Sequence, residues 1–142
     1  MSNDPDSTVY PASCLCGGVR YDVSGPLDEA ALCHCSMCRR ATGSAFNVAV
    51  PVAEAQLRWI ARETLREFES SPGKMRAFCS GCGAAVYSRR AAKPGQLRLR
   101  IGLIEGLSDL SDVYHIYWAD RLSWMDRFGD LPKNAAEEPG RS

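Results

Sequence analysis

Apolar and polar residues alternate along much of the chain, a pattern that predicts β-strands. Residues 18–24 alternate and then stop at a Gly-Pro turn signal. Residues 96–102 alternate as cleanly, and residues 113–118 form a further apolar strand. Residues 45–52 predict a more buried strand, ended by Pro51. The pattern therefore indicates a mainly β protein.

The middle of the chain predicts two hairpins. Residues 56–60 and 65–69 are expected to pair with each other across a short connection. Residues 75–78 lead into a turn that contains two cysteines and residues 84–88 lead out of it, which is the shape of a zinc knuckle. Helical periodicity is scarce, and only residues 28–32 are expected to form a single helical turn.

The two ends of the chain are polar and predict flexible tails. One tail is expected over residues 1–9 and the other over residues 133–142. A length of 142 residues suits one domain, which we expect over residues 10–132.

The charge balance excludes several classes of function. Seventeen basic residues cancel seventeen acidic ones, so the attraction that drives non-specific binding to nucleic acid is missing. No apolar run approaches the roughly 20 residues of a membrane span. The N-terminal residues lack the basic and apolar regions of a signal peptide. We therefore expect a soluble, cytoplasmic domain without a membrane partner.

Seven cysteines are the strongest chemical signal in the composition. They fall as Cys14-Leu15-Cys16, then Cys33-His34-Cys35-Ser36-Met37-Cys38, then Cys79-Ser80-Gly81-Cys82. Thiolates two and three residues apart can surround one ion, whereas a C-x-C pair is a poor disulfide. Soft thiolate sets favour zinc, and the spacings fit an iron–sulfur cluster less well.

The seven thiols divide into a set of four and a set of three. The first and third clusters supply two ligands each and complete a four-thiolate site, which is structural as a rule. Cys33, Cys35 and Cys38 lie within one short loop and can reach one ion together, but their segment has no fourth ligand. An open position is what separates catalytic zinc from structural zinc. The division therefore predicts two zinc ions with different roles.

Two histidines and two arginines leave alternatives open at the second site. His115 can close the site from a distant strand and make it structural; otherwise it is a half-buried strand residue. His34 is then a group behind the ligands or one that faces the substrate. Arg39 and Arg40 directly follow the loop and either hold a substrate carboxylate or form a solvated basic pair.

The motifs in this order resemble the glutathione-dependent formaldehyde-activating enzyme (GFA) family, which also includes centromere protein V. The resemblance covers roughly residues 10–132. Three cysteine clusters in this order and spacing are specific to the family, whereas a single C-x-x-C motif would not be. The residues that match are Ser13–Tyr21, Cys33–Arg39, Thr42–Phe46, Ser70–Lys74, Phe78–Gly83 and His115-Ile116.

The resemblance implies a β-tent fold of small stacked antiparallel sheets with two zinc ions. By position, Cys14, Cys16, Cys79 and Cys82 resemble the structural zinc ligands of the family. Cys33, Cys35 and Cys38 resemble its catalytic set. The activity implied is that of a carbon–sulfur lyase of the S-(hydroxymethyl)glutathione synthase type, which condenses glutathione with formaldehyde. Small thiols and aldehydes are the partners this implies.

A non-enzymatic zinc module that binds protein or nucleic acid is the alternative. Its aromatic and basic contacts would come from Trp59, Trp118 and Trp124 with Arg98, Arg100, Arg121 and Arg127. With zero net charge and no long basic run, these aromatic residues are expected in the core or at its rim instead.

Overall fold

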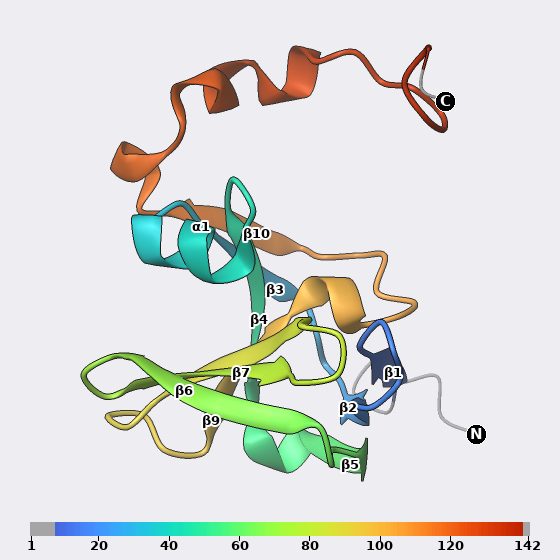
Figure 1. Ribbon diagram of the computed structural model, residues 1–142, viewed down its shortest axis with the longest axis vertical. Helices are drawn as coiled ribbons and strands as arrows, with labels where there is room; N and C mark the ends of the chain where they lie inside the picture. The colour runs from blue at the N-terminus through green and yellow to red at the C-terminus, as the bar shows by residue number, and fades with distance from the viewer. Residues whose placement is uncertain (1–7, 141–142) are drawn as a thin grey trace.

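The fold consists of two β-sheets of unequal size, seen in a computed structural model that describes residues 8–140 (Figure 1). The small sheet has the order β1-β2-β5, and the large sheet has the order β10-β3-β4-β9-β8-β7-β6. The strands of the small sheet are β1 (Val9–Ser13), β2 (Arg20–Ser24) and β5 (Leu57–Ala61). Those of the large sheet are β3 (Glu29–Cys33), β4 (Asn47–Ala53), β6 (Leu65–Ser71), β7 (Lys74–Cys79), β8 (Ala85–Arg90), β9 (Gln96–Arg100) and β10 (Asp112–Ile116).

Helices are few and short in the described part of the chain. The α-helix α1 spans Ser36–Thr42, directly after β3. Short 3₁₀ helices span Glu54–Gln56, Ile101–Leu103, Trp118–Asp120 and Ser123–Asp130. No helix of residues 8–140 has the length and apolar character needed to cross a bilayer. After β10 the chain leaves the sheets and arches away from them toward the C-terminus (Figure 1).

The predicted mainly β architecture with stacked sheets is confirmed, and the core lies between the two sheets. Tyr21 on β2 packs edge-on against Trp59 on β5, with ring centroids 5.3 Å apart. Trp59 in turn meets Tyr87 on β8 of the large sheet, at 6.3 Å. Leu97 and Leu99 of β9 are buried beneath the same contacts, because alternate residues of a strand point to the same face.

Several strands differ from the sequence predictions in pairing. The predicted hairpin between residues 56–60 and 65–69 is wrong, because β5 pairs with β2 and β6 pairs with β7. The link between β5 and β6 instead crosses from one sheet to the other. The predicted helical turn at residues 28–32 is also wrong, since these residues mostly form β3, which lies between β4 and a parallel β10.

Pro51 does not end its strand as predicted. It lies inside β4 opposite Arg98 of β9, and the strand continues to Ala53. On the other side of β4, β3 pairs only with residues 47–49. At Pro51 the strand is therefore paired with β9 only, and its edge toward β3 is open. Proline lacks a backbone N–H, and on an open edge that absence costs no ladder hydrogen bond.

The N-terminal tail predicted for residues 1–9 falls mostly on residues 1–7, which lie outside the described part of the chain. Val9 is already the first residue of β1.

Three strands of the large sheet are joined on the core side by one carboxylate. Glu67 on β6 accepts hydrogen bonds from the Tyr87 hydroxyl, at 2.8 Å, and from Arg89 Nε, at 2.7 Å, both on β8. Ala77 of β7 lies between them in the register, and its small methyl side chain lets them meet. The Arg89 guanidinium and the Tyr87 hydroxyl lower the pKa of Glu67, so the carboxylate is charged at neutral pH.

We expect Glu67→Gln to lower the free energy of unfolding by about 1 kcal/mol at pH 7, because the pair is partly exposed to solvent and the charge-assisted bonds are lost. Urea unfolding of the zinc-loaded protein measures the difference. Glu69→Gln, on the same strand and exposed, is the matched control and should leave the midpoint unchanged. Equal midpoints for Glu67→Gln and the parent would contradict this role.

Candidate metal centres and the cavity beside them

Four cysteines from two distant segments meet where the small sheet adjoins the large one. Cys14 and Cys16 follow β1, Cys79 ends β7, and Cys82 lies in the turn before β8. Their sulfur atoms all lie within 4.8 Å of one another. The Cys14 and Cys16 sulfurs are 3.7 Å apart, and those of Cys16 and Cys79 are 3.6 Å apart. The turn between β7 and β8 thus has the knuckle shape that the sequence predicted.

Backbone and hydroxyl groups prepare these sulfurs for a metal ion. The amide of Val19 donates to Cys14 Sγ at 3.3 Å, and the amide of Gly18 to Cys16 Sγ at 3.4 Å. The Thr64 hydroxyl, 3.2 Å from Cys79 Sγ, lowers the pKa of that thiol to about 6. Gly18 is required here, because a Cβ at this position would lie 2.5 Å from the Thr64 hydroxyl oxygen.

The other three cysteines surround the start of α1. Cys33 is the last residue of β3, Cys35 caps the helix, and Cys38 lies in its first turn. The amide of Cys38 donates to Cys35 Sγ at 3.3 Å, and the sulfurs of Cys33 and Cys35 are 3.5 Å apart. The helix ends before Gly43, which has a left-handed φ of 67° and whose backbone N–H donates a hydrogen bond to the carbonyl of Arg39, closing the last turn.

The sulfur spacings fit a bound metal ion in both clusters. Four sulfurs placed tetrahedrally at about 2.3 Å from one ion are about 3.8 Å apart. The sulfur separations of 3.5 Å to 3.7 Å in the two clusters lie close to that value. The first cluster offers four sulfurs and the second three, so both can hold an ion.

The two histidines lie beside the second cluster and are not part of it. His34 is fully buried, and its Nε2 lies 2.8 Å from Nδ1 of His115 on β10. Burial and the neighbouring His115 lower the pKa of His34, so its ring is neutral at neutral pH. Among the described residues, only cysteines form the metal-binding clusters. His115 therefore does not close the second site, and it is exposed rather than half-buried.

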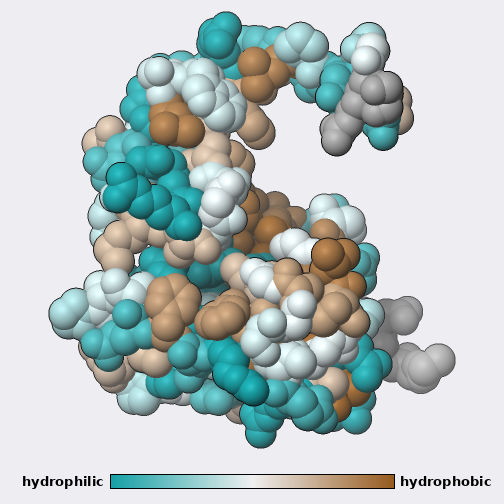
Figure 2. Space-filling view, viewed as in Figure 1, coloured by the Kyte–Doolittle hydropathy of each residue, from teal (hydrophilic) through white to brown (hydrophobic). Residues whose placement is uncertain are grey.

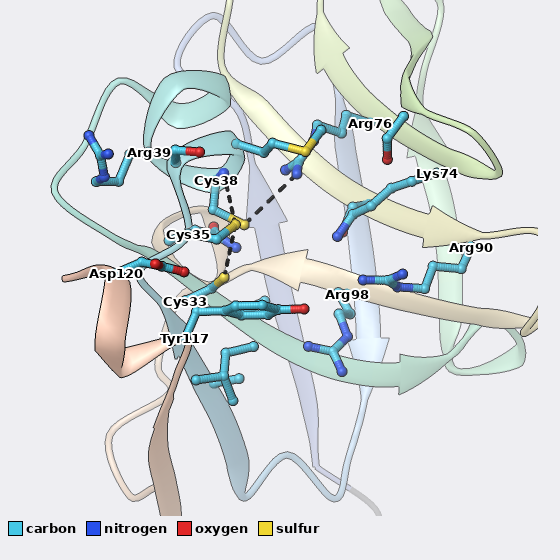
Figure 3. Close-up of a pocket in the computed structure, with 18 of the residues that line it drawn as sticks. Cys33, Cys35, Cys38, Arg39, Lys74, Arg76, Arg90, Arg98, Tyr117 and Asp120 are labelled. Atoms are coloured by element: carbon cyan, nitrogen blue, oxygen red, sulfur yellow. Dashed lines mark hydrogen bonds between the residues drawn. The ribbon is translucent and has the colours of Figure 1, made fainter.

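A cavity of about 770 Å³ opens beside the three-cysteine cluster. Cys33, Cys35 and Cys38 lie at one end, and Arg90 and Lys74 lie at the other (Figure 3). Figure 2 shows polar and apolar side chains mixed over this part of the surface.

Arg76 lies in the wall of the cavity beside Cys38. It is 4% exposed, and its Nη2 donates to Cys38 Sγ at 3.8 Å while its Nε donates to the Ser70 hydroxyl at 2.9 Å. Burial alone would raise the pKa of Cys38, but hydrogen bonds from Cys33, Cys35 and Arg76 lower it below its ordinary value. A buried guanidinium thus favours the thiolate form at the wall of the cavity.

The other residues that the sequence suggested for binding lie in different parts of the structure. Arg39 lines the cavity, whereas Arg40 is exposed on α1 and does not. Trp59 belongs to the core as expected. Trp118 packs on His34 and His115, with ring centroids 5.2 Å and 4.5 Å away.

Sequence reasoning missed most of the cavity wall. The residues that line it without having been predicted include Lys74, Arg76, Arg90, Lys93, Tyr117 and Asp120. The signal available was the recurrence of Lys or Arg at every second residue of a strand, as in residues 74–76 and 98–100, which places the charges on one face.

Comparisons with known proteins agree with this architecture. A comparison with curated proteins gave no significant match. Among solved structures, the crystal structure of a Rhodobacter sphaeroides protein from structural genomics is similar, with a TM-score of 0.59 and 27% sequence identity. The match covers 75% of this chain and 99% of that one.

A scan against protein families matches the model described as glutathione-dependent formaldehyde-activating enzyme over residues 9–120. The match includes all seven cysteines and every strand described above, and it spans most of the chain. The chain therefore belongs to the glutathione-dependent formaldehyde-activating enzyme (GFA) family.

Proposed function

We propose that this protein is a zinc-dependent enzyme of the carbon–sulfur lyase type, which adds a thiol such as glutathione to a small aldehyde such as formaldehyde, or catalyses the reverse reaction. The observation that supports this most is the position of three cysteine thiols in the wall of a cavity of about 770 Å³. Membership of the GFA family supports thiol and aldehyde substrates.

The two clusters have different roles in this proposal. Cys14, Cys16, Cys79 and Cys82 hold a structural zinc ion, because four thiolates leave it no free coordination position. Cys33, Cys35 and Cys38 hold the catalytic zinc ion, because three protein ligands leave a fourth position. Zinc suits both sets, since thiolates are soft ligands and the sulfur spacings match its bond lengths.

The chemistry is the addition of sulfur to a carbonyl carbon. A zinc ion bound to three cysteines supplies one property, a lowered pKa for a thiol at its fourth position. The substrate sulfur forms a bond to the carbonyl carbon, the π electrons move to oxygen, and the oxygen takes up the proton lost by the thiol. The product is a hemithioacetal, and the reverse sequence breaks the same carbon–sulfur bond.

Residues of the chain hold this site in place and adjust its charge. Three thiolates with one divalent ion have a net charge of about −1, and the buried Arg76 guanidinium beside Cys38 offsets it. His34 is held beside the cluster by the hydrogen bond to His115 and by its backbone N–H, which donates to the carbonyl of Ile116 on β10 at 3.1 Å. The ligand loop is therefore rigid on the side away from the cavity.

Turnover tests the proposal directly. Zinc-loaded protein incubated with glutathione and formaldehyde should consume both in equal amounts and form S-hydroxymethylglutathione faster than the uncatalysed reaction. Nuclear magnetic resonance with ¹³C-labelled formaldehyde follows the adduct. A rate equal to the uncatalysed one with glutathione and with other small thiols would refute the enzyme and favour the alternative of a zinc-stabilised binding module.

Cys79→Ser should unfold the domain, because a structural zinc site contributes on the order of 10 kcal/mol to the folding of small metal-dependent domains. Circular dichroism and zinc content, measured on the same sample, check this outcome. A Cys79→Ser protein that binds two zinc ions and melts like the parent would show that the division into four and three ligands is incorrect.

Cys35→Ser should remove about one zinc ion per chain and abolish turnover while the fold persists, because the four-cysteine cluster is untouched. Ser36→Ala, at the neighbouring position of α1, is the control and should retain both ions. Global unfolding of Cys35→Ser would assign a structural role to the second cluster.

A further inference from the structure

The large sheet presents two chemically opposite faces. One face carries the buried apolar residues of the core, such as Tyr87 and Leu99. On the other face, Lys74 of β7 lies directly opposite Arg90 of β8, and Ser88 of β8 lies between Arg76 and Arg98 of its two neighbours. These positions are on adjacent strands about 4.8 Å apart, so the side chains converge on one part of the cavity.

Positive charge on this face greatly exceeds negative charge. The basic residues that line the cavity are Arg39, Lys74, Arg76, Arg90, Lys93 and Arg98. Asp120 is the single acidic residue of the described chain that lines it. Even if the three cysteines with a divalent ion count as one further negative charge, four positive charges remain uncompensated.

These cations have no carboxylate partners within residues 8–140. The ion pairs of the described chain involve Arg58, Arg89 and Arg121, none of which lines the cavity. Arg76 is 4% exposed, and its Nη1 is buried without any hydrogen-bond partner. Neither a carboxylate nor a hydrogen-bond acceptor therefore satisfies the whole of this guanidinium, and an unpaired buried cation is costly.

The arrangement is unfavourable in the absence of such a ligand. Like charges directly opposite each other on neighbouring strands destabilise a sheet. Burial together with the nearby Arg76 and Arg90 lowers the pKa of Lys74, as expected for a cation in a positive environment. An anion placed between Lys74 and Arg90 would offset this repulsion.

We propose that this cationic face, defined by Lys74, Arg76, Ser88, Arg90 and Arg98, binds a phosphate group carried by a thiol or an aldehyde substrate. The substrate's reacting sulfur or carbonyl then lies at the cysteine end of the cavity, next to Tyr117 (Figure 3). The inference rests on the proposed function only for the position of the reacting atoms.

The charges favour a phosphate over the groups of glutathione. Glutathione carries two carboxylates and an ammonium group, so its net charge is −1. Asp120 is the one acidic residue lining the cavity in the described chain that could pair with the ammonium group. A phosphate monoester concentrates nearly two negative charges on one tetrahedral group. Arginine forks, a lysine and a serine hydroxyl are the side chains that bind such a group.

Calorimetric titration with inorganic phosphate tests the proposal without any turnover. Phosphate is added to the zinc-loaded protein at constant ionic strength, and malonate, glutathione and a single-stranded oligonucleotide are titrated in parallel. We expect saturable binding of phosphate that is tighter than that of malonate and glutathione. Arg98→Gln and Arg90→Gln should each weaken it by about tenfold or more, because a charge-assisted hydrogen bond is lost.

Arg58→Gln, on the small sheet and away from the cavity, is the control and should bind phosphate like the parent. Circular dichroism and zinc content show whether each variant is folded and loaded. If Arg98→Gln does not fold, Arg90→Gln alone tests the phosphate site, since Arg90 is exposed.

No phosphate binding, or equal affinity for phosphate in the parent and in Arg90→Gln, would overturn the proposal. Tighter binding of malonate would assign the face to carboxylates, and tighter binding of the oligonucleotide to nucleic acid; either would overturn it as well. Phosphate binding without thiol–aldehyde turnover would overturn the enzyme and leave this site standing.

Discussion

The meeting of Cys16 and Cys79 is the contact on which the rest of the molecule depends. The two residues are 63 positions apart, and one belongs to the loop after β1 while the other ends β7. The chain passes between the small and the large sheet from β2 to β3, from β4 to β5 and from β5 to β6. Closing so long a loop is entropically costly, and a metal ion shared by these cysteines would offset part of that cost. Thr64 and Gly18, packed together on the cluster, show that the link between the sheets is shaped around the same sulfurs.

The two faces of the large sheet have different roles, since one face forms the core and the other lines the cavity. Leu97 and Leu99 on one face of β9 build the core, while Arg98 between them faces the cavity. The same alternation on β7 and β8 separates Tyr87 from Ser88 and Ala77 from Arg76. The wall of the cavity is thus the reverse side of the core.

What the sequence could predict followed from spacing and period. Local cysteine spacing predicted which thiols group together, because a C-x-C or C-x-x-C segment brings its own sulfurs close with little help from the fold, and the structure groups the seven cysteines as four and three. Alternation of apolar and polar residues located β2 and β9, because it too is a local property of the sequence. It could not decide that β5 pairs with β2 instead of β6, since that choice depends on the packing of Trp59 against Tyr21. The helix α1 was missed because Ser36–Thr42 is too short to establish a helical period and its cap is a cysteine. The cavity wall was missed because Lys74, Arg90 and Arg98 become neighbours only through the strand register.

One sulfur atom links the local helix to the site it serves. Cys35 Sγ accepts the amide hydrogen of Cys38 and, at the same time, belongs to the three-sulfur cluster. An N-terminal helix cap is ordinarily a serine, threonine or aspartate, whose side-chain oxygen accepts a backbone N–H and binds nothing else. In the proposed zinc site the cap and the metal ligand would be one atom, so the order of the first helical turn and the occupancy of the cluster would be thermodynamically linked. The exchange rate of one backbone hydrogen, that of Cys38, would then report in solution how much of the protein holds a metal ion.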